Sequence, residues 1–539
     1  MGRGRTRTNA ETVYWLLVTG YWLLVLAGCG ADALPGAETA VSPTLIPTAQ
    51  MVPTATPMPT ATATLPPTAV PTQVPTTMPT ITPVPTATDL PPITLAVPQE
   101  WVERVQTAVS HHPGQRGWQI MTAAEAQAEV RLVNDDSGIL LWREPLALAV
   151  PFTAPVEGVD LAKAQAIVAG TDQGDITLRL WRDMVPQLRA LRVNGRFPPD
   201  LDYPLQASWS LLAPPELADT AEQLAAELRA GRENEPLVWL TAVGDIMLDR
   251  SLGYYLNLGN LAYPFADIAD ELKQADYTVG NMESALGSVG ERASKSYTFR
   301  APPQAAEALA LAGFDLLTLA NNHGMDFGPE ALAQGLGLLH AQGLATVGAG
   351  ANATTARQPH LATVNGLTLA FLGYVNVPVE ARGFDTATWT ATETAPGLAW
   401  GYPEVIAADV TAVRSQADVV IVLLHSGYEY QENPSPPQVA AAKAAIDAGA
   451  DLVIGHHAHI LQGVEFYNGG VIAYGLGNFA FEIDGSPETA VFHFWLDKNG
   501  VRQLAFTPAV IQFGGQPRLA TAPEAFAIRQ QIYRLTDRQ

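Results

Sequence analysis

The sequence has few cysteines and few basic residues, and each shortage excludes a class of protein. Cys29 is the single cysteine among 539 residues, so a disulfide framework and a thiolate zinc cluster are both excluded. Thirty Lys and Arg residues stand against 53 Asp and Glu residues, which gives a formal net charge of −23. Nucleic-acid binding requires a basic face, so we expect no nucleic-acid partner. Any metal site must use His, Asp, Glu or Asn side chains.

Proline is concentrated in one weakly charged segment. Sixteen of the 42 prolines lie between Pro35 and Pro98, and residues 29–98 contain three charged residues. Such a segment cannot bury enough apolar surface to offset the entropy lost on ordering, so residues 29–98 are predicted to be a disordered linker. Its Pro/Thr repeats favour polyproline II, with a reach on the order of 200 Å. Residues 1–28 carry +2 and the linker −3, which leaves −22 on about 440 residues, enough for two or three domains.

The N-terminus has the pattern of a signal peptide that ends at the single cysteine. Three arginines precede an apolar run at residues 13–28, which is short for a membrane span and typical of a signal peptide. The run ends in Leu-Ala-Gly-Cys at residues 26–29, which resembles a bacterial lipobox. The resemblance implies cleavage after residue 28, lipidation of Cys29, and export to the outer face of the cell membrane. An ordinary cleavage site or an uncleaved anchor is the alternative.

Residues 99–235 are predicted to form a smaller α/β accessory domain without a chemical motif. The pattern predicts a strand at residues 146–150 and helices at residues 160–168 and 219–230. Parts of this region weakly resemble one lobe of a periplasmic solute-binding protein. The region is too short for a two-lobed binder, so a structural spacer is favoured over ligand binding.

From Leu237 onward, apolar runs alternate with helical segments, and each run ends in polar residues. Their continuous Val/Ile/Leu content is typical of strands buried on both faces. The pattern predicts a layered α/β domain over residues 236–490, which residues 491–539 complete with further strands and a helix. Because sites gather at the carboxyl ends of such strands, six polar clusters are expected to converge on one crevice. The clusters are Gly244-Asp245, Asn281-Met282-Glu283, Asn321-Asn322-His323, His425, Gly455-His456-His457-Ala458-His459 and Gly475-Leu476-Gly477-Asn478.

These clusters together have the chemistry of a metal site. Imidazole, carboxylate and amide oxygen ligands suit Mn, Zn or Fe, and the number of donors allows one or two ions. Paired ions can activate a hydroxide and stabilise an in-line displacement at phosphorus, and a nearby histidine can protonate the leaving group. Most of the clusters taken alone have ordinary explanations, such as a turn or a helix cap. Three histidines at residues 456–459 after a buried strand are costly without a partner.

Six ordered motifs resemble those of the CapA family of capsule-synthesis and poly-γ-glutamate-biosynthesis proteins. The match covers roughly residues 237–484. The family is similar in fold to calcineurin-like metallophosphoesterases, so the resemblance implies a two-sheet sandwich flanked by helices. It also implies a surface protein that makes, exports or anchors an anionic γ-glutamyl polymer. The motifs are GDIMLDR at 244–250, NME at 281–283, ANNHGMDFG at 320–328, HSGYEY at 425–430, GHHAHI at 455–460 and YGLGNF at 474–479.

The metallophosphoesterase pattern implies a role for each residue that matches it. His323 matches the catalytic histidine, and Glu283 takes the place of the bridging aspartate. The histidine expected two positions after Asp245 is Met247 here, which weakens one metal position and leaves one ion expected with a second in doubt. His456 is an additional histidine. The implied metal ligands are Asp245, Glu283, Asn322, His425, His457 and His459.

Two further residues are candidates for substrate binding. Glu429 lies four residues past His425 and is expected either to support a metal ligand or to face the substrate. Arg300 is a candidate clamp for a phosphate or carboxylate, with a surface arginine as the alternative.

Two functional classes are consistent with these patterns. The first is a surface-anchored assembly factor that holds an anionic polymer or capsule synthase subunits, with a divalent metal site. The second is a metal-dependent phosphoesterase or γ-glutamyl hydrolase that acts on another cell-envelope substrate. The missing histidine favours the first class, and the Asn322-His323 pair favours the second. An acidic surface repels polyglutamate unless arginines or cations mediate the contact, so a bound divalent ion is expected in either class.

Overall fold

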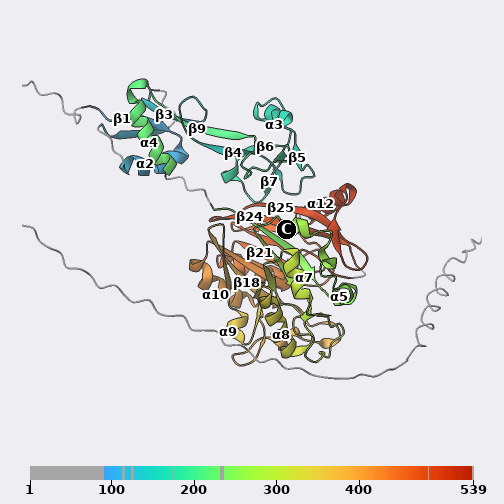
Figure 1. The fold of residues 1–539 in the computed structure, drawn as a ribbon. Helices are drawn as coiled ribbons and strands as arrows, with labels where there is room; N and C mark the ends of the chain where they lie inside the picture. The colour runs from blue at the N-terminus through green and yellow to red at the C-terminus, as the bar shows by residue number, and fades with distance from the viewer. Residues whose placement is uncertain are drawn as a thin grey trace, which may run out of the picture. The chain divides into compact units, whose positions relative to one another are not determined.

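The computed structural model describes most of the chain after residue 89 (Figure 1). The predicted signal peptide, Cys29 and most of the linker lie outside the described residues. The predicted linker boundary at residue 98 is wrong, because Ile93–Val97 forms strand β1 with Leu95 and Val97 fully buried. Prolines flank this apolar run on both sides, so the proline content hid it. The described residues are 90–111, 116–122, 127–172, 174–230, 236–482 and 485–536.

The first region, to residue 230, is built on a seven-stranded sheet in the order β2-β1-β3-β9-β4-β6, with β7 also paired to β4. The 13-residue β4 pairs with β9 along its first half and with β6 and β7 along its second. It therefore joins two small cores. The strands are β2 (Trp118–Thr122), β3 (Val130–Val133), β4 (Ile139–Pro151), β6 (Thr177–Leu180), β7 (Leu188–Ala190) and β9 (Gln206–Leu212), with β5 (Gly158–Val159) paired to β8 (Arg192–Val193).

The α-helices of this region pack on the same two cores. The predictions of a strand at 146–150 and helices at 160–168 and 219–230 are confirmed by β4, α3 and α4. Helix α3 begins where predicted because the Asp160 carboxylate accepts a hydrogen bond from the Lys163 amide at 2.8 Å. The α-helices are α2 (Val102–His111), α3 (Leu161–Val168) and α4 (Ala218–Ala230).

The second region, from residue 236, contains two large mixed sheets. The first has the order β15-β14-β11-β10-β24-β25-β26, and the second has the order β17-β18-β20-β21-β23-β22. Strands β10, β11 and β14 run parallel, as do β18, β20, β21 and β23. The first sheet comprises β10 (Val238–Ile246), β11 (Tyr277–Met282), β14 (Leu316–Thr318), β15 (Ala345–Val347), β24 (Glu488–Asp497), β25 (Gly500–Ile511) and β26 (Pro517–Leu519). The second comprises β17 (His360–Val364), β18 (Leu367–Asn376), β20 (Val419–Ser426), β21 (Leu452–His456), β22 (Val464–Tyr467) and β23 (Gly470–Ala473).

Alternation along the strands shows that the two sheets pack face to face. Ile421 and Leu423 of β20 share one core with Leu240 of β10, whereas Val420 and Val422 belong to another core with helices α10 and α11. Successive strand residues point to opposite faces, so one face of this sheet meets the other sheet and the opposite face meets helices. The helices on this side are α9 (Ala353–Ala356), α10 (Pro403–Val413) and α11 (Pro436–Asp447).

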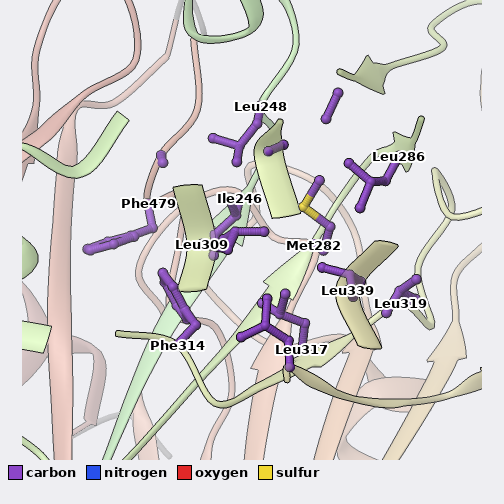
Figure 2. Packing of buried hydrophobic residues seen from close by; sticks show 14 of the residues in the cluster. Ile246, Leu248, Met282, Leu286, Leu309, Phe314, Leu317, Leu319, Leu339 and Phe479 are labelled. Carbon is purple, nitrogen blue, oxygen red and sulfur yellow. The ribbon is translucent and has the colours of Figure 1, made fainter. Parts of the chain in front are cut away.

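A further core lies between the first sheet and its own helices (Figure 2). Ile246 of β10 and Leu317 of β14 pack there with Leu309 of α7 and Leu339 of α8. The result is a two-sheet sandwich flanked by helices, the architecture that the family resemblance implies. The helices on this side are α5 (Arg250–Asn257), α6 (Ala269–Leu272), α7 (Ala305–Ala312) and α8 (Gly328–Ala341).

The C-terminal residues complete the sandwich, and the first region contacts it. Strands β24 to β26 extend the first sheet, and helix α12 (Ala522–Thr536) contributes Ile528 and Ile532 to the core between the sheets. Phe152 from the first region enters that same core, and its ring lies 5.8 Å from that of Phe466. Among the residues described, no helix has the length and apolar character of a membrane-crossing segment.

Candidate metal centre

The predicted strand ends converge at one edge of the sandwich. Asp245 ends β10, Glu283 follows β11, His425 lies near the end of β20, and His457 follows β21. These four residues are 0–4% exposed. A parallel bridge between Asp245 and Asn478 joins the ends of the two sheets. Each parallel strand therefore delivers one polar residue to the same buried edge, as predicted.

Two triads of possible metal ligands form there, and Glu283 belongs to both. Asp245, Glu283 and His459 make one triad, and Glu283, His425 and His457 make the other, with the ligand atoms of each triad within 4.8 Å of one another. In the first triad, His459 Nε2 lies 3.6 Å from Glu283 Oε1. In the second, His425 Nε2 lies 3.7 Å from the same oxygen. A shared carboxylate is the arrangement that a bridging ligand of two ions requires.

The Glu283 carboxylate is the feature of this site that best fits a bound ion. Its side chain is fully buried, and neither oxygen has a hydrogen-bond partner among the described residues. A buried carboxylate without partners is strongly unfavourable. Burial, with the charge of Asp245 second, raises the pKa of Glu283 well above its usual value. The donor set of carboxylate, imidazole and amide oxygen around it fits a divalent transition metal.

Asn322 lies next to the second triad, and its role as a ligand stays a prediction. Its Oδ1 accepts a hydrogen bond from His425 Nε2 at 2.9 Å. Neighbouring ligand atoms around one ion with bonds of about 2.1 Å are separated by about 3 Å, so this pair is already spaced for a shared ion. The side chain of Asn281 donates to Asp245 Oδ1 at 2.8 Å and lies 3.1 Å from His425 Nδ1. Asn281 thus links the two triads.

Hydrogen bonds distinguish His459, a candidate metal ligand, from His456, which has a structural role. His459 Nδ1 lies 2.8 Å from Asn478 Oδ1, which holds the proton on Nδ1 and leaves Nε2 on the side of Glu283. His456 Nε2 lies 3.2 Å from the Val243 carbonyl and belongs to neither triad. It ties β21 to β10. His457 and His459 have φ values of 87° and 56°, a strained conformation that is concentrated at functional sites.

The pKa values separate His459 from the two histidines of the second triad. Burial lowers the pKa of His425 well below its usual value and that of His457 to about 3, so both rings are neutral at pH 7. Burial also disfavours the charged form of His459, but Glu283 and Asp245 outweigh it and raise its pKa to about 10. Without a metal, a protonated His459 therefore supplies the positive charge beside the carboxylates.

His323 lies next to this cluster and is held by a carboxylate that the sequence analysis did not single out. Its Nδ1 lies 2.7 Å from Asp326 Oδ2, and its ring lies 4.4 Å from that of Phe299. Burial lowers the pKa of His323, while Asp326 opposes that shift. A histidine oriented through Nδ1 by a buried carboxylate presents Nε2 as a proton donor or acceptor. Asp326 follows His323 by three positions, a spacing that could have indicated this pair.

Met247 occupies the position of the absent histidine. It is fully buried and packs with Phe299 and Phe481. Its sulfur accepts a hydrogen bond from the Asp249 amide at 3.3 Å. The first triad therefore has one imidazole, His459, whereas the second has two. Glu429 forms a third group with His457 and His459, so it lies where an additional carboxylate ligand would be.

The two predicted substrate-binding residues are placed differently. Glu429 is exposed and lies beside His457 and His459. The Arg300 guanidinium lies 4.2 Å from the centre of the Phe327 ring, and its role as a clamp stays a prediction. Arg250 was not predicted: its guanidinium lies 5.1 Å from the Phe299 ring, and its charge opposes the rise in the pKa of Tyr430. That rise is caused mainly by burial.

Comparison with known proteins gives one matching family. The family model for the bacterial capsule synthesis protein PGA_cap matches residues 239–483. The capsule biosynthesis protein CapA of Bacillus anthracis is 33% identical over 317 residues, covering 57% of this chain and 75% of the relative. The PGA biosynthesis protein CapA of Bacillus subtilis is 33% identical over 271 residues, covering 49% of this chain and 70% of the relative.

Solved structures give more distant matches. A hypothetical protein from Thermus thermophilus is 14% identical with a TM-score of 0.33, covering 50% of this chain and 98% of that one. A putative 5'-nucleotidase from Staphylococcus aureus, solved with α-ketoglutarate, is 14% identical with a TM-score of 0.31, covering 55% of this chain and 58% of that one.

Proposed function

Because this chain belongs to the PGA_cap family of bacterial capsule synthesis proteins, we propose that it acts in the synthesis, export or anchoring of an anionic polymer of the poly-γ-glutamate type. The names of its relatives support a role in capsule or poly-γ-glutamate biosynthesis. The same names do not distinguish a polymerising, exporting or anchoring role.

The observation that carries the chemical part of the proposal is the Glu283 carboxylate shared by two ligand triads. A divalent ion bound there supplies positive charge and Lewis acidity. Asp245, Glu283 and His459 would hold one ion, and Glu283, Asn322, His425 and His457 would hold the other. Because the folded part of the chain is strongly acidic, such positive charge gives an anionic polymer an attractive point of contact.

Metal analysis of the purified full chain tests the site. We expect manganese, zinc or iron to co-purify with the wild type. The double substitution His457→Ala with His459→Ala, which removes an imidazole from each triad, is expected to lose the metal. His456→Ala is the matched control, since His456 hydrogen-bonds the Val243 carbonyl and belongs to neither triad. A well-folded wild type that binds no divalent metal would refute the site.

The contact between His323 and Asp326 favours a second function, metal-dependent hydrolysis of a phosphoester or γ-glutamyl bond. Asp326 holds the proton on Nδ1 of His323, which leaves Nε2 to exchange a proton with a leaving group. The neighbouring Asn322 faces the second triad, so ligand and proton carrier are consecutive residues. Glu429, which is exposed and groups with His457 and His459, would contact the substrate.

A chromogenic phosphodiester with added manganese tests hydrolysis. Turnover, if present, is expected to fall by about 10²–10⁴-fold in His323→Ala, the usual contribution of a general acid or base. Asp326→Asn is expected to lower kcat more than it changes KM, because it alters the orientation of His323 and leaves the metal ligands in place. Unchanged turnover in His323→Ala would remove the acid–base role.

We also propose that the mature chain is held at the outer face of the cell membrane through lipidated Cys29, with the Pro/Thr-rich segment as a spacer. The pattern Leu-Ala-Gly-Cys at residues 26–29 and the preceding apolar run support this proposal. A polymer that leaves the cell at the membrane surface would then meet the metal centre outside it.

A further inference from the structure

Lys295 is a buried cation beside the loop that carries both the candidate metal ligand Asn322 and the candidate acid His323. Its side chain has no exposed surface. Its Nζ lies 3.1 Å from Asp326 Oδ1 and 2.9 Å from Glu380 Oε1, and it donates a hydrogen bond to the Asn322 carbonyl. Burying an ammonium group is energetically costly unless it is paired, so the protein depends on these three contacts to keep Lys295 buried.

One branch of contacts runs from Lys295 to His323. Asp326 is fully buried, and its Oδ2 receives both His323 Nδ1 at 2.7 Å and the Phe299 amide at 2.6 Å. Lys295 lies on the other oxygen of the same carboxylate. The two hydrogen bonds to Oδ2 and the ion pair at Oδ1 restrain the Asp326 carboxylate, and that carboxylate in turn orients the ring of His323.

A second branch runs from Lys295 to Asn322. Glu380 Oε1 accepts from Lys295 and also from Asn322 Nδ2 at 3.3 Å and Thr386 Oγ1 at 3.3 Å. Because the amide nitrogen of Asn322 is held on the side of Glu380, its Oδ1 must point the other way, toward His425 Nε2. Lys295 additionally holds the backbone carbonyl of Asn322.

Aromatic rings enclose the ammonium on a further side. The rings of Phe384 and Trp389 lie 5.4 Å and 5.2 Å from Nζ, within cation–π range. Lys295, Glu380 and Phe384 come from loops and Trp389 ends a short 3₁₀ helix (Thr386–Trp389), whereas Asp245, Glu283 and His425 lie at or next to strand ends. The contacts of Lys295 therefore connect these segments to the candidate metal centre.

We propose that Lys295 is a positioning residue that orients Asn322 through Glu380 and His323 through Asp326, so that one ammonium sets both the metal ligand and the proton carrier. The inference rests on the proposed metal site and adds residues that the family pattern did not assign. A purely structural ion pair would stabilise the fold without affecting either readout below.

The test compares Lys295→Met with Arg502→Met in the full-length protein. Arg502 also forms a buried ion pair, with Nε 2.6 Å from Asp497 Oδ2, at the opposite end of the first sheet. Both substitutions are expected to lower the melting temperature. Only Lys295→Met is expected to weaken Mn²⁺ binding, by about 10–100-fold, as removal of residues that support metal ligands commonly does. Mn²⁺ affinity is measured by titration calorimetry on the folded protein.

A second readout does not require metal. With ¹⁵N-labelled histidine, metal-free wild type is expected to show His323 protonated on Nδ1, a signal identified by its loss in His323→Ala. Lys295→Met is expected to give a mixture of tautomers, whereas Glu380→Ala is expected to keep the signal and weaken Mn²⁺ binding alone. If Lys295→Met does not fold, Glu380→Ala still tests the branch to Asn322.

The outcomes separate the two hypotheses. If wild type binds neither Mn²⁺ nor Zn²⁺ nor Fe²⁺, the proposed metal site fails, and the tautomer of His323 still tests the role of Lys295. If wild type binds Mn²⁺ and Lys295→Met matches it in both affinity and tautomer, the positioning role is overturned and the metal site stands. Equal effects of Arg502→Met and Lys295→Met on affinity would likewise overturn it, because the effect would then follow general destabilisation.

Discussion

Two buried titratable residues, His459 and Glu283, both have raised pKa values at the centre of this site. His459 keeps its proton because Glu283 and Asp245 surround it, and the pKa of Glu283 is raised by burial in turn. The ligands that an ion needs must be deprotonated, so an entering ion competes with a proton. His457, whose pKa is lowered to about 3, needs no such exchange.

This competition predicts that Mn²⁺ affinity rises with pH. The His459 pKa of about 10 means that the ring is protonated at pH 7 and must release its proton on binding. One released proton corresponds to an affinity gain of about tenfold per pH unit from pH 6.5 to 8.5. Titration calorimetry in buffers of different ionisation enthalpy measures the proton directly. Between two buffers, the binding enthalpy should differ by the difference between their ionisation enthalpies for each proton released, and a pH-independent affinity would contradict the prediction.

The raised pKa of His459 also affects the stability of the metal-free protein: stability should fall with rising pH, whereas metal affinity should rise. The raised pKa of His459 means that its charge stabilises the metal-free fold fully below pH 6.5, the ordinary histidine value. That contribution is lost as the pH rises toward about 10. Metal-free protein should therefore become less stable over the pH range in which metal affinity improves.

Single residues were predictable where a strand end or a sequence motif carries them, and not where a loop without a motif does. Asp245, Glu283 and His425 lie at or just beyond the ends of continuous apolar runs, so their convergence follows from parallel strands sharing one edge. Lys295 and Glu380 lie in loops without periodicity, and their contact spans 85 positions of sequence. The local sequence around either residue does not indicate that the two are in contact.

At the scale of elements, the apolar runs predicted six strands, and all six form. What they did not predict is which strands share a sheet: β10, β11 and β14 belong to one sheet, and β20, β21 and β23 to the other. The apolar composition of a strand indicates that it is buried, but not which strand it pairs with. The division of the strands between two sheets therefore could not be predicted from the sequence. The extra strand β1 was missed because prolines surround it.

Gly244 of β10 makes a close backbone contact with Gly477, which follows β23, and this contact predicts an element-scale substitution effect. A Cβ on Gly244 would lie 1.9 Å from the Gly477 carbonyl oxygen, beside the bridge between Asp245 and Asn478. Gly244→Ala should force the strand ends apart, destabilise the protein by about 1–3 kcal/mol, and weaken Mn²⁺ binding. Chemical denaturation and metal titration measure the two effects.

Gly337 in helix α8 is the matched control for that substitution. No atom lies within 4 Å of a Cβ built at this position. Gly337→Ala should stabilise the protein by about 0.5–1 kcal/mol, because alanine loses less backbone entropy in a helix, and should leave Mn²⁺ affinity unchanged. A Gly244→Ala variant as stable as wild type would show that the strand ends tolerate separation.

At the scale of the whole molecule, the region before residue 230 shares apolar packing with the sandwich. Phe152 is 4% exposed in the core between the two sheets, near Phe466 and Phe506. The Ala190 amide donates to Gln503 Oε1 at 2.7 Å. A boundary near residue 235 describes the change in sequence pattern, but apolar packing and hydrogen bonds cross it.

Shared packing predicts cooperative unfolding. Phe152→Ala should destabilise the sandwich by about 3–5 kcal/mol, because it leaves a cavity in a core formed mainly by residues after 236. The exposed Phe513 is the control, and Phe513→Ala should change stability by less than about 0.5 kcal/mol. Calorimetry checks both values. If Phe152→Ala instead removes a separate low-temperature unfolding transition and leaves the melting temperature of the sandwich unchanged, the first region unfolds independently.

The proposed attachment of the whole molecule depends on one atom, the sulfur of Cys29. If Cys29 is lipidated, the mature chain should sediment with membranes and take up labelled fatty acid, and Cys29→Ser should do neither. A Cys29→Ser chain that is exported but released should still bind Mn²⁺, because the metal centre lies more than 200 residues away in sequence. If released protein also no longer supports polymer deposition, the spacer and anchor serve to hold the metal centre where the polymer emerges. Equal membrane association of wild type and Cys29→Ser would instead favour an uncleaved apolar anchor.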